Sequence, residues 1–254
     1  MTIANVLEHL ERYAPLSLAQ SWDNVGLLIG DLKRPVNKVL ISLDVTPNAL
    51  AYAIENDFDL ILSHHPLIFR PLSSITNPVI LNMIEARISL ISMHTNFDAA
   101  LGGVNHALAD ALELQVQDSL GDPEAGDIGL ICSYPSPRSL DEIASFVKES
   151  LQAPAVKLWT AGLDRDVLIK RIAICGGAGG SVLANASKYT DLLITGDISY
   201  HSFLDSGIPI IDAGHFATEY PALSALQQSL SSIGVKSQIL DSNLHEWKLW
   251  MQYL

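Results

Sequence analysis

Short apolar runs alternate along the chain with segments whose apolar residues recur every three or four positions. Such runs are typical of buried strands, and the longer spacing is typical of helices with one apolar face. A strand, a helix and a second strand in this order indicate parallel pairing through a crossover. The pattern therefore predicts an α/β fold with mostly parallel sheets flanked by helices. The predicted strands cover residues 38–43, 60–62, 88–93, 130–134, 156–160, 170–175, 191–195 and 208–211.

The predicted helices follow the same alternation. The first contains Ile3, Val6 and Leu10 at helical spacing, and we expect it to end before Pro15. The other predicted helices cover residues 49–54, 79–86, 104–112, 139–151 and 181–189, with one more from Ala222.

The second half of the chain repeats the order of the first. Residues 170–175, 191–195 and 208–211 parallel residues 38–43, 59–63 and 88–91. This repeat predicts two similar α/β lobes from an internal duplication, with their strand ends at a shared cleft. We place the first lobe at residues 1–116 and the second at 117–254. The boundary lies in the acidic, glycine-bearing stretch 115–129, and the C-terminal segment is allowed to pack back on the first lobe.

Histidines follow three of the predicted strands. His64 and His65 come directly after one strand, and His94 follows another with Asp98 four residues later. Ligands of open α/β sheets bind at the carboxyl ends of strands, so these imidazoles are placed for chemistry. Residues four apart on a helix share a face, which puts His94 beside Asp98.

The second half has a pair with the same spacing, His215 and Glu219. Asp197 and His201 are further candidate ligands there, held as reserves. Imidazoles with carboxylates suit zinc, iron, manganese or cobalt, and a carboxylate can bridge two cations. The alternative is a set of hydrogen-bonded polar residues at a domain interface, without a metal.

Two further stretches each have two interpretations. Residues 22–26, Trp-Asp-Asn-Val-Gly, form either a tight turn before a strand or part of a pocket. The glycine run 176–180 is either a structural turn or a cradle for a phosphate group at a helix start. The chain has neither a Gly-x-Ser-x-Gly nucleophile motif nor a P-loop.

Composition narrows the functional classes. The net charge of −13 argues against binding nucleic acid, which needs basic patches to neutralise phosphates. Cys132 and Cys175 are too few for a disulfide framework, so we expect a reduced, cytoplasmic protein. The N-terminus lacks a basic region, and no apolar run reaches about 18 residues. We therefore expect neither a signal peptide nor a membrane span.

These motifs together resemble the Nif-three-like family of dinuclear-metal-centre proteins, some members of which are called GTP cyclohydrolase I type 2 homologues. The resemblance covers nearly the whole chain. It rests on residues 22–26, residues 63–66, residues 94–98, Gly196-Asp197 with His201, and residues 215–219. Longer members carry a domain between the lobes, and the stretch 115–160 is too short to contain it.

The resemblance implies a two-lobed α/β fold assembled as a ring-shaped homohexamer, with a dinuclear site facing an internal cavity. It implies two divalent metal ions per chain, zinc, iron or manganese, with Asp98 and Glu219 as bridging ligands. His94 is implied to lie beside the metals as an acid/base group. The implied ligands are His64, His65, Asp98, His215 and Glu219.

These features favour a metal-dependent hydrolase that acts on a nucleotide or a related heterocycle, such as one that opens the guanine ring of GTP. A phosphoesterase with the same metals is the first alternative, which the glycine run 176–180 would favour. A metal-binding scaffold or regulatory partner without turnover is the second.

Overall fold

The computed structural model describes residues 1–121 and 128–245. The chain divides into two compact units. The first unit contains Met1–Ala100 together with the described residues from Leu223 onward, and the second contains Leu101–Ala222. The predicted position of the lobe boundary at residues 116 and 117 stays a prediction, and residues 122–127 of the predicted boundary stretch lie outside the described residues.

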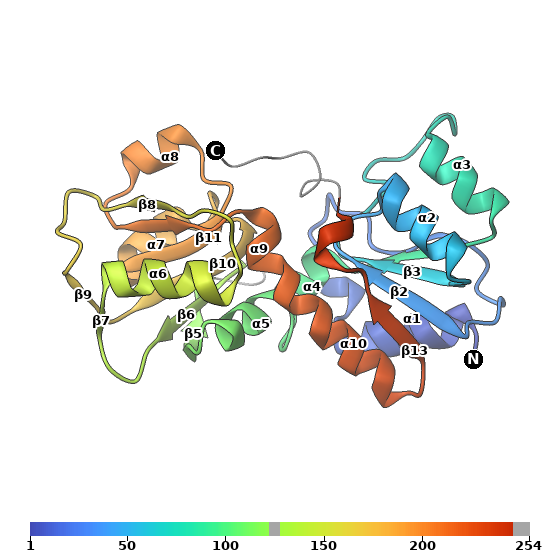
Figure 1. The fold of residues 1–254 in the computed structure, drawn as a ribbon, viewed down its shortest axis with the longest axis horizontal. Helices are drawn as coiled ribbons and strands as arrows, with labels where there is room; N and C mark the ends of the chain where they lie inside the picture. Colours follow the sequence, from blue (N-terminus) through green and yellow to red (C-terminus); the bar gives the residue numbers. More distant parts are fainter. Residues whose placement is uncertain (122–127, 246–254) are drawn as a thin grey trace. The chain divides into compact units, whose positions relative to one another are not determined.

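The first unit is built on a five-stranded sheet with the order β1-β4-β3-β2-β13 (Figure 1). Neighbouring strands β2, β3 and β4 are parallel, as predicted, and β13 adds to β2 in parallel. Only β1 runs antiparallel, beside β4. The strands are β1 (Gly26–Ile29), β2 (Lys38–Ser42), β3 (Leu60–Ser63), β4 (Ser89–Ser92) and β13 (Lys236–Ile239).

Helices cover this sheet because alternate residues of its strands are apolar on both faces. Leu40, Ile61 and Leu90 pack with the apolar sides of α2 and α3 in one buried cluster. The first helix, α1, ends at Tyr13, before Pro15 as predicted, and a capping box between Thr2 and Asn5 stabilises its start. The helices are α1 (Ile3–Tyr13), α2 (Pro47–Glu55), α3 (Pro78–Glu85), α4 (Thr95–Ala99) and α10 (Leu223–Ser232).

The second unit contains a six-stranded sheet with the order β5-β6-β10-β11-β12-β8. Strands β10, β11 and β12 are parallel, whereas β6 and β8 flank them in antiparallel orientation. Strands β7 (Arg138–Ser139) and β9 (Leu168–Ile169) form a separate pair. The strands of the large sheet are β5 (Gln115–Ser119), β6 (Leu130–Ser133), β8 (Lys157–Trp159), β10 (Ile172–Ala178), β11 (Leu192–Gly196) and β12 (Ile210–Asp212).

Both faces of the second sheet are covered as well. Ile172 and Ile174 pack with α5 and α6 on one face, while Ala173 and Cys175 pack with α7 on the other. The mixed α/β class with helix-flanked sheets is thus confirmed, whereas the internal duplication stays a prediction. The helices are α5 (Val104–Ala111), α6 (Leu140–Ser150), α7 (Leu183–Tyr189), α8 (Tyr200–Asp205) and α9 (His215–Glu219).

One strand of this sheet lacks an apolar run. All residues of β5 are exposed, and four of its five side chains are polar. It joins the sheet through backbone hydrogen bonds with β6, and its pattern of side chains therefore does not predict a strand. Among the described residues, no helix combines the length and apolar character that crossing a membrane requires.

Candidate metal-binding clusters

The first unit gathers three imidazoles at the ends of two neighbouring strands. His64 and His65 directly follow β3, and their amides still donate to Ser42 and Leu43 as the chain turns. His94 follows β4 and occupies the N-cap position of α4, without a side-chain capping bond. The ring centroids lie 4.9 Å apart for His64 and His65, 5.3 Å for His64 and His94, and 5.6 Å for His65 and His94. One nitrogen from each ring lies within 4.8 Å of the others, so this group can hold a metal ion.

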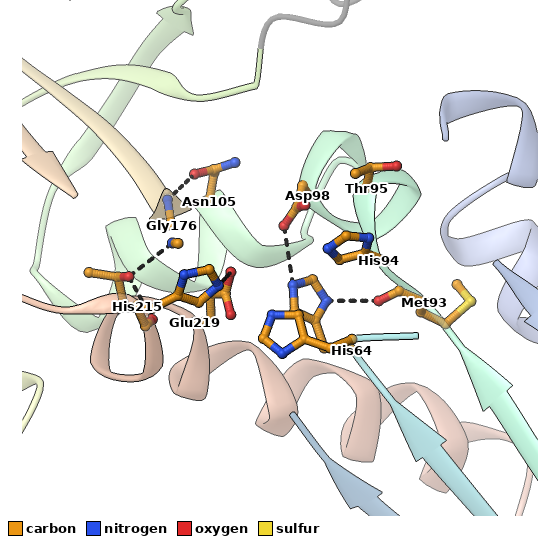
Figure 2. Close-up of polar contacts among 12 residues, drawn as sticks. His64, Met93, His94, Thr95, Asp98, Asn105, Gly176, His215 and Glu219 are labelled. Carbon is orange, nitrogen blue, oxygen red and sulfur yellow. Dashed lines mark hydrogen bonds and ion pairs between the residues drawn. The ribbon is translucent and has the colours of Figure 1, made fainter. Parts of the chain in front are cut away.

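Each of these rings is oriented through its Nδ1 atom. His64 Nδ1 lies 2.8 Å from the carbonyl oxygen of Met93 (Figure 2). A carbonyl oxygen only accepts, so this nitrogen carries the proton and Nε2 of the neutral ring carries the lone pair. His65 Nδ1 lies 2.8 Å from Asp44, and His94 Nδ1 lies 2.9 Å from Asp23. Metal-binding histidines are held in this way, with the second ring nitrogen directed at the ion.

Asp98 completes the group of the first unit. Its Oδ1 atom lies 3.6 Å from His64 Nε2, and the His64 side chain is almost fully buried. A lone pair and a carboxylate repel one another unless a proton or a metal cation lies between them. The donor set of imidazole nitrogens and a carboxylate therefore fits a divalent metal ion.

The second unit has a smaller group at the start of α9. His215 Nε2 lies 3.0 Å from Glu219 Oε1, and His215 Nδ1 lies 2.9 Å from Asp197. Both ring nitrogens thus face carboxylates, an arrangement that needs an imidazolium or a cation at Nε2. Glu219 is buried on the face of α9 that it shares with His215. This pair also fits a metal ion by its donor atoms.

The glycine run lies next to this pair. Gly177 has a φ of +66°, and a Cβ atom there would collide with the Glu219 carboxylate. The amides of Gly176, Gly177 and Gly179 donate to Asn105, Thr218 and Gly196, respectively. Figure 2 shows the first of these bonds. These amides are therefore engaged within the unit, which supports the structural interpretation of the run over the phosphate cradle.

Asp23 was not predicted as a functional residue by itself, because the sequence placed it only in the stretch 22–26, a turn or part of a pocket. Its buried carboxylate accepts hydrogen bonds from His94, from the Thr95 amide at 3.0 Å and from the Thr95 hydroxyl. Burial by itself raises the pKa of Asp23, but the bonds from His94 and Thr95 outweigh it and lower the pKa to about 2. Asp23 is thus an anion at neutral pH and stabilises a positive charge on His94.

The sequence offered partial signals for the orienting carboxylates. Asp44 follows a predicted strand and Asp197 was a reserve ligand, yet both bind Nδ1 atoms in the structure. His201, the other reserve residue, is exposed on α8 with its ring 5.5 Å from that of Tyr200.

The family model for Duf34/NIF3 (NGG1p interacting factor 3) matches residues 1–245. The chain belongs to this family. The predicted resemblance is therefore confirmed.

Relatives and solved structures agree with this NIF3 membership. A protein of Clostridium perfringens called GTP cyclohydrolase 1 type 2 homolog is 35% identical over 243 residues, which are 91% of each chain. The NIF3-like protein 1 of Drosophila melanogaster is 32% identical over 80% of this chain and 72% of its own. The crystal structure of a hypothetical protein from Staphylococcus aureus superposes with a TM-score of 0.87 at 29% identity, covering 100% of this chain and 99% of that one.

The glycine beside Glu219 allows a matched test of the packing. We expect Gly177→Ala to lower the free energy of unfolding by more than about 1 kcal/mol, because alanine disfavours the positive φ and its methyl group displaces the carboxylate. Gly180→Ala is the control, since a Cβ there meets nothing within 4 Å. Urea unfolding of both variants measures the difference, and equal stabilities would contradict this role of Gly177.

The low pKa of Asp23 predicts a pH dependence of stability. Its folded value of about 2 lies below the ordinary 3.8, so its contribution is present above about pH 4 and is lost as the pH falls through about 2. The stability difference between the native protein and Asp23→Asn should therefore shrink over this range. Urea unfolding at several pH values tests this, and a constant difference would refute it.

Proposed function

We propose that the clusters of the two units would hold two divalent metal ions per chain, with Asp98 and Glu219 as the carboxylate ligands. His64, His65 and His215 are the proposed nitrogen ligands. The observation that carries this proposal is the orientation of these imidazoles: an acceptor binds each Nδ1 atom, which directs Nε2 to an ion. Zinc, iron and manganese all accept this donor set.

We propose that His94 transfers protons and is not a ligand. An imidazole can both accept and donate a proton, and the hydrogen bond from Nδ1 to Asp23 fixes the orientation of this ring. His94 would then accept a proton at Nε2 from a reacting group and return it later. When bound, divalent ions lower the pKa of a coordinated water and polarise an electrophile.

The proposed reaction is hydrolysis of a nucleotide or a related heterocycle. The name of the Clostridium relative, GTP cyclohydrolase 1 type 2 homolog, supports this class, because a GTP cyclohydrolase opens the guanine ring. Incubation of the metal-loaded protein with GTP tests it, and formate or a ring-opened formamide is the expected product. Release of phosphate alone would replace this proposal with a phosphoesterase, and absence of turnover with a broad substrate panel would replace it with a metal-binding scaffold.

The glycine run in the second unit no longer favours the phosphoesterase. It was favoured by the glycine run as an anion site, and three amides of that run donate to Asn105, Thr218 and a backbone carbonyl. The heterocycle hydrolase is therefore the function we propose. We also propose that the protein is cytoplasmic.

Metal content distinguishes the proposed ligands from the proposed acid/base group. After repletion with zinc, manganese or iron, elemental analysis should give roughly two equivalents for the native protein and clearly less for His65→Ala and Glu219→Ala. His94→Ala should keep its metal while turnover falls by about 100-fold. Circular dichroism controls for folding. Metal loss in His94→Ala equal to that in His65→Ala would make His94 a ligand, which the spacing of the three imidazoles also permits.

We also propose a homohexamer, on the basis of the family resemblance. Closed rings of identical subunits are a common form of symmetric oligomers. Static light scattering at micromolar concentration should report a mass close to six times that of one chain. A monomer whose mass does not change with concentration would contradict this.

A further inference from the structure

Two exposed aromatic side chains lie beside His94 in the first unit. Trp22 is 56% exposed and Phe69 is 43% exposed, although indole and phenyl groups are usually buried. Trp22 belongs to the turn before β1, and Phe69 belongs to the segment between β3 and α3. The two rings are 5.6 Å apart at an interplanar angle of 47°, so neither covers the face of the other.

The position of this pair is fixed from both sides. The Asn24 side chain donates a hydrogen bond to the Ile68 carbonyl, which joins the segments that carry Trp22 and Phe69. The rings of Trp22 and His94 are also in a T-shaped arrangement, with 6.3 Å between their centroids and an interplanar angle of 72°. The adjacent residue, Asp23, turns its carboxylate inward to His94. Two adjacent residues of one turn therefore have different roles: Asp23 orients the imidazole of His94, and Trp22 presents an aromatic surface.

We infer that Trp22 and Phe69 form a platform on which the planar ring of a heterocyclic substrate stacks beside His94. This inference rests on the proposed function and assigns the recognition of the ring to these two residues. Stacking needs an exposed aromatic face and tolerates different bases, because every base has a π-face. A purine or pteridine ring on this platform would have its edge close to the imidazole that transfers protons.

The occupant that we favour is a small planar molecule and not a second copy of the chain. The aromatic surface adjoins a group of polar, metal-ligating side chains at strand ends, which is the setting of small-molecule sites. A contact between copies would instead be expected to extend over a wider apolar area.

Calorimetric titration of the metal-loaded protein with GTP and with inorganic tripolyphosphate tests the inference. Tripolyphosphate shares the phosphate chain but has no ring. Trp22→Ala should raise the Kd for GTP by about 5- to 100-fold and leave the Kd for tripolyphosphate within about twofold. Phe69→Ala should act in the same direction, whereas Trp22→Phe should retain most of the affinity. Tyr189→Ala, an exposed aromatic residue of the second unit, is the matched control and should bind as the native protein does.

Three results would overturn the platform. The first is an unchanged Kd for GTP in Trp22→Ala. The second is a native protein that binds neither GTP nor ATP more tightly than tripolyphosphate. The third is loss of the native oligomeric state in Trp22→Ala, measured by light scattering, which would assign the pair to a contact between copies.

The same experiments separate the platform from the hydrolase. Ring-dependent binding without any turnover keeps the platform and refutes the hydrolase. Turnover of GTP with an unchanged Kd in Trp22→Ala keeps the hydrolase and refutes the platform.

Discussion

The hydrogen bonds to the Nδ1 atoms of the histidines are the interactions on which the candidate chemistry depends. Burying a polar ring costs free energy unless its donor finds an acceptor, and His64 is almost fully buried. Met93, Asp44, Asp23 and Asp197 supply those acceptors from neighbouring turns. The bond from His64 offsets the burial of its ring, and all four bonds determine which ring nitrogen keeps its lone pair. The same hydrogen bonds therefore hold the rings in place and determine which nitrogen of each ring could coordinate a cation.

The sequence predicted most of the strands of the two sheets, because parallel strands that are buried on both faces consist of short apolar runs. β2, β3 and β4 were found within one or two residues of their ends. The strand β5 was not found, since its polar side chains are exposed and only its backbone joins the sheet. β13 also lacks an apolar run, and its partner β2 is almost 200 residues away in sequence.

The candidate ligands were visible in the sequence because histidines follow three predicted strands, but their orienting partners were not. Asp23 lies 71 residues from His94, and a turn is an ordinary position for aspartate. Only the fold reveals that its side chain points inward while that of Trp22 points outward. The glycine run shows the same limit: the sequence left both a structural turn and an anion site open, whereas the structure shows α9 packed closely on β10.

The place of β13 in the first sheet has a consequence for synthesis on the ribosome. The second unit interrupts the first between Ala100 and Leu223, so β13 and α10 are translated after the whole second unit. The second unit is one continuous segment and has all of its strands before that point. The second unit can therefore fold during translation before the first unit is complete. Until β13 is synthesised, one edge of β2 has no strand partner. A nascent chain of this design exposes one edge of β2 until β13 emerges, and this is the interval in which a chaperone would protect that edge.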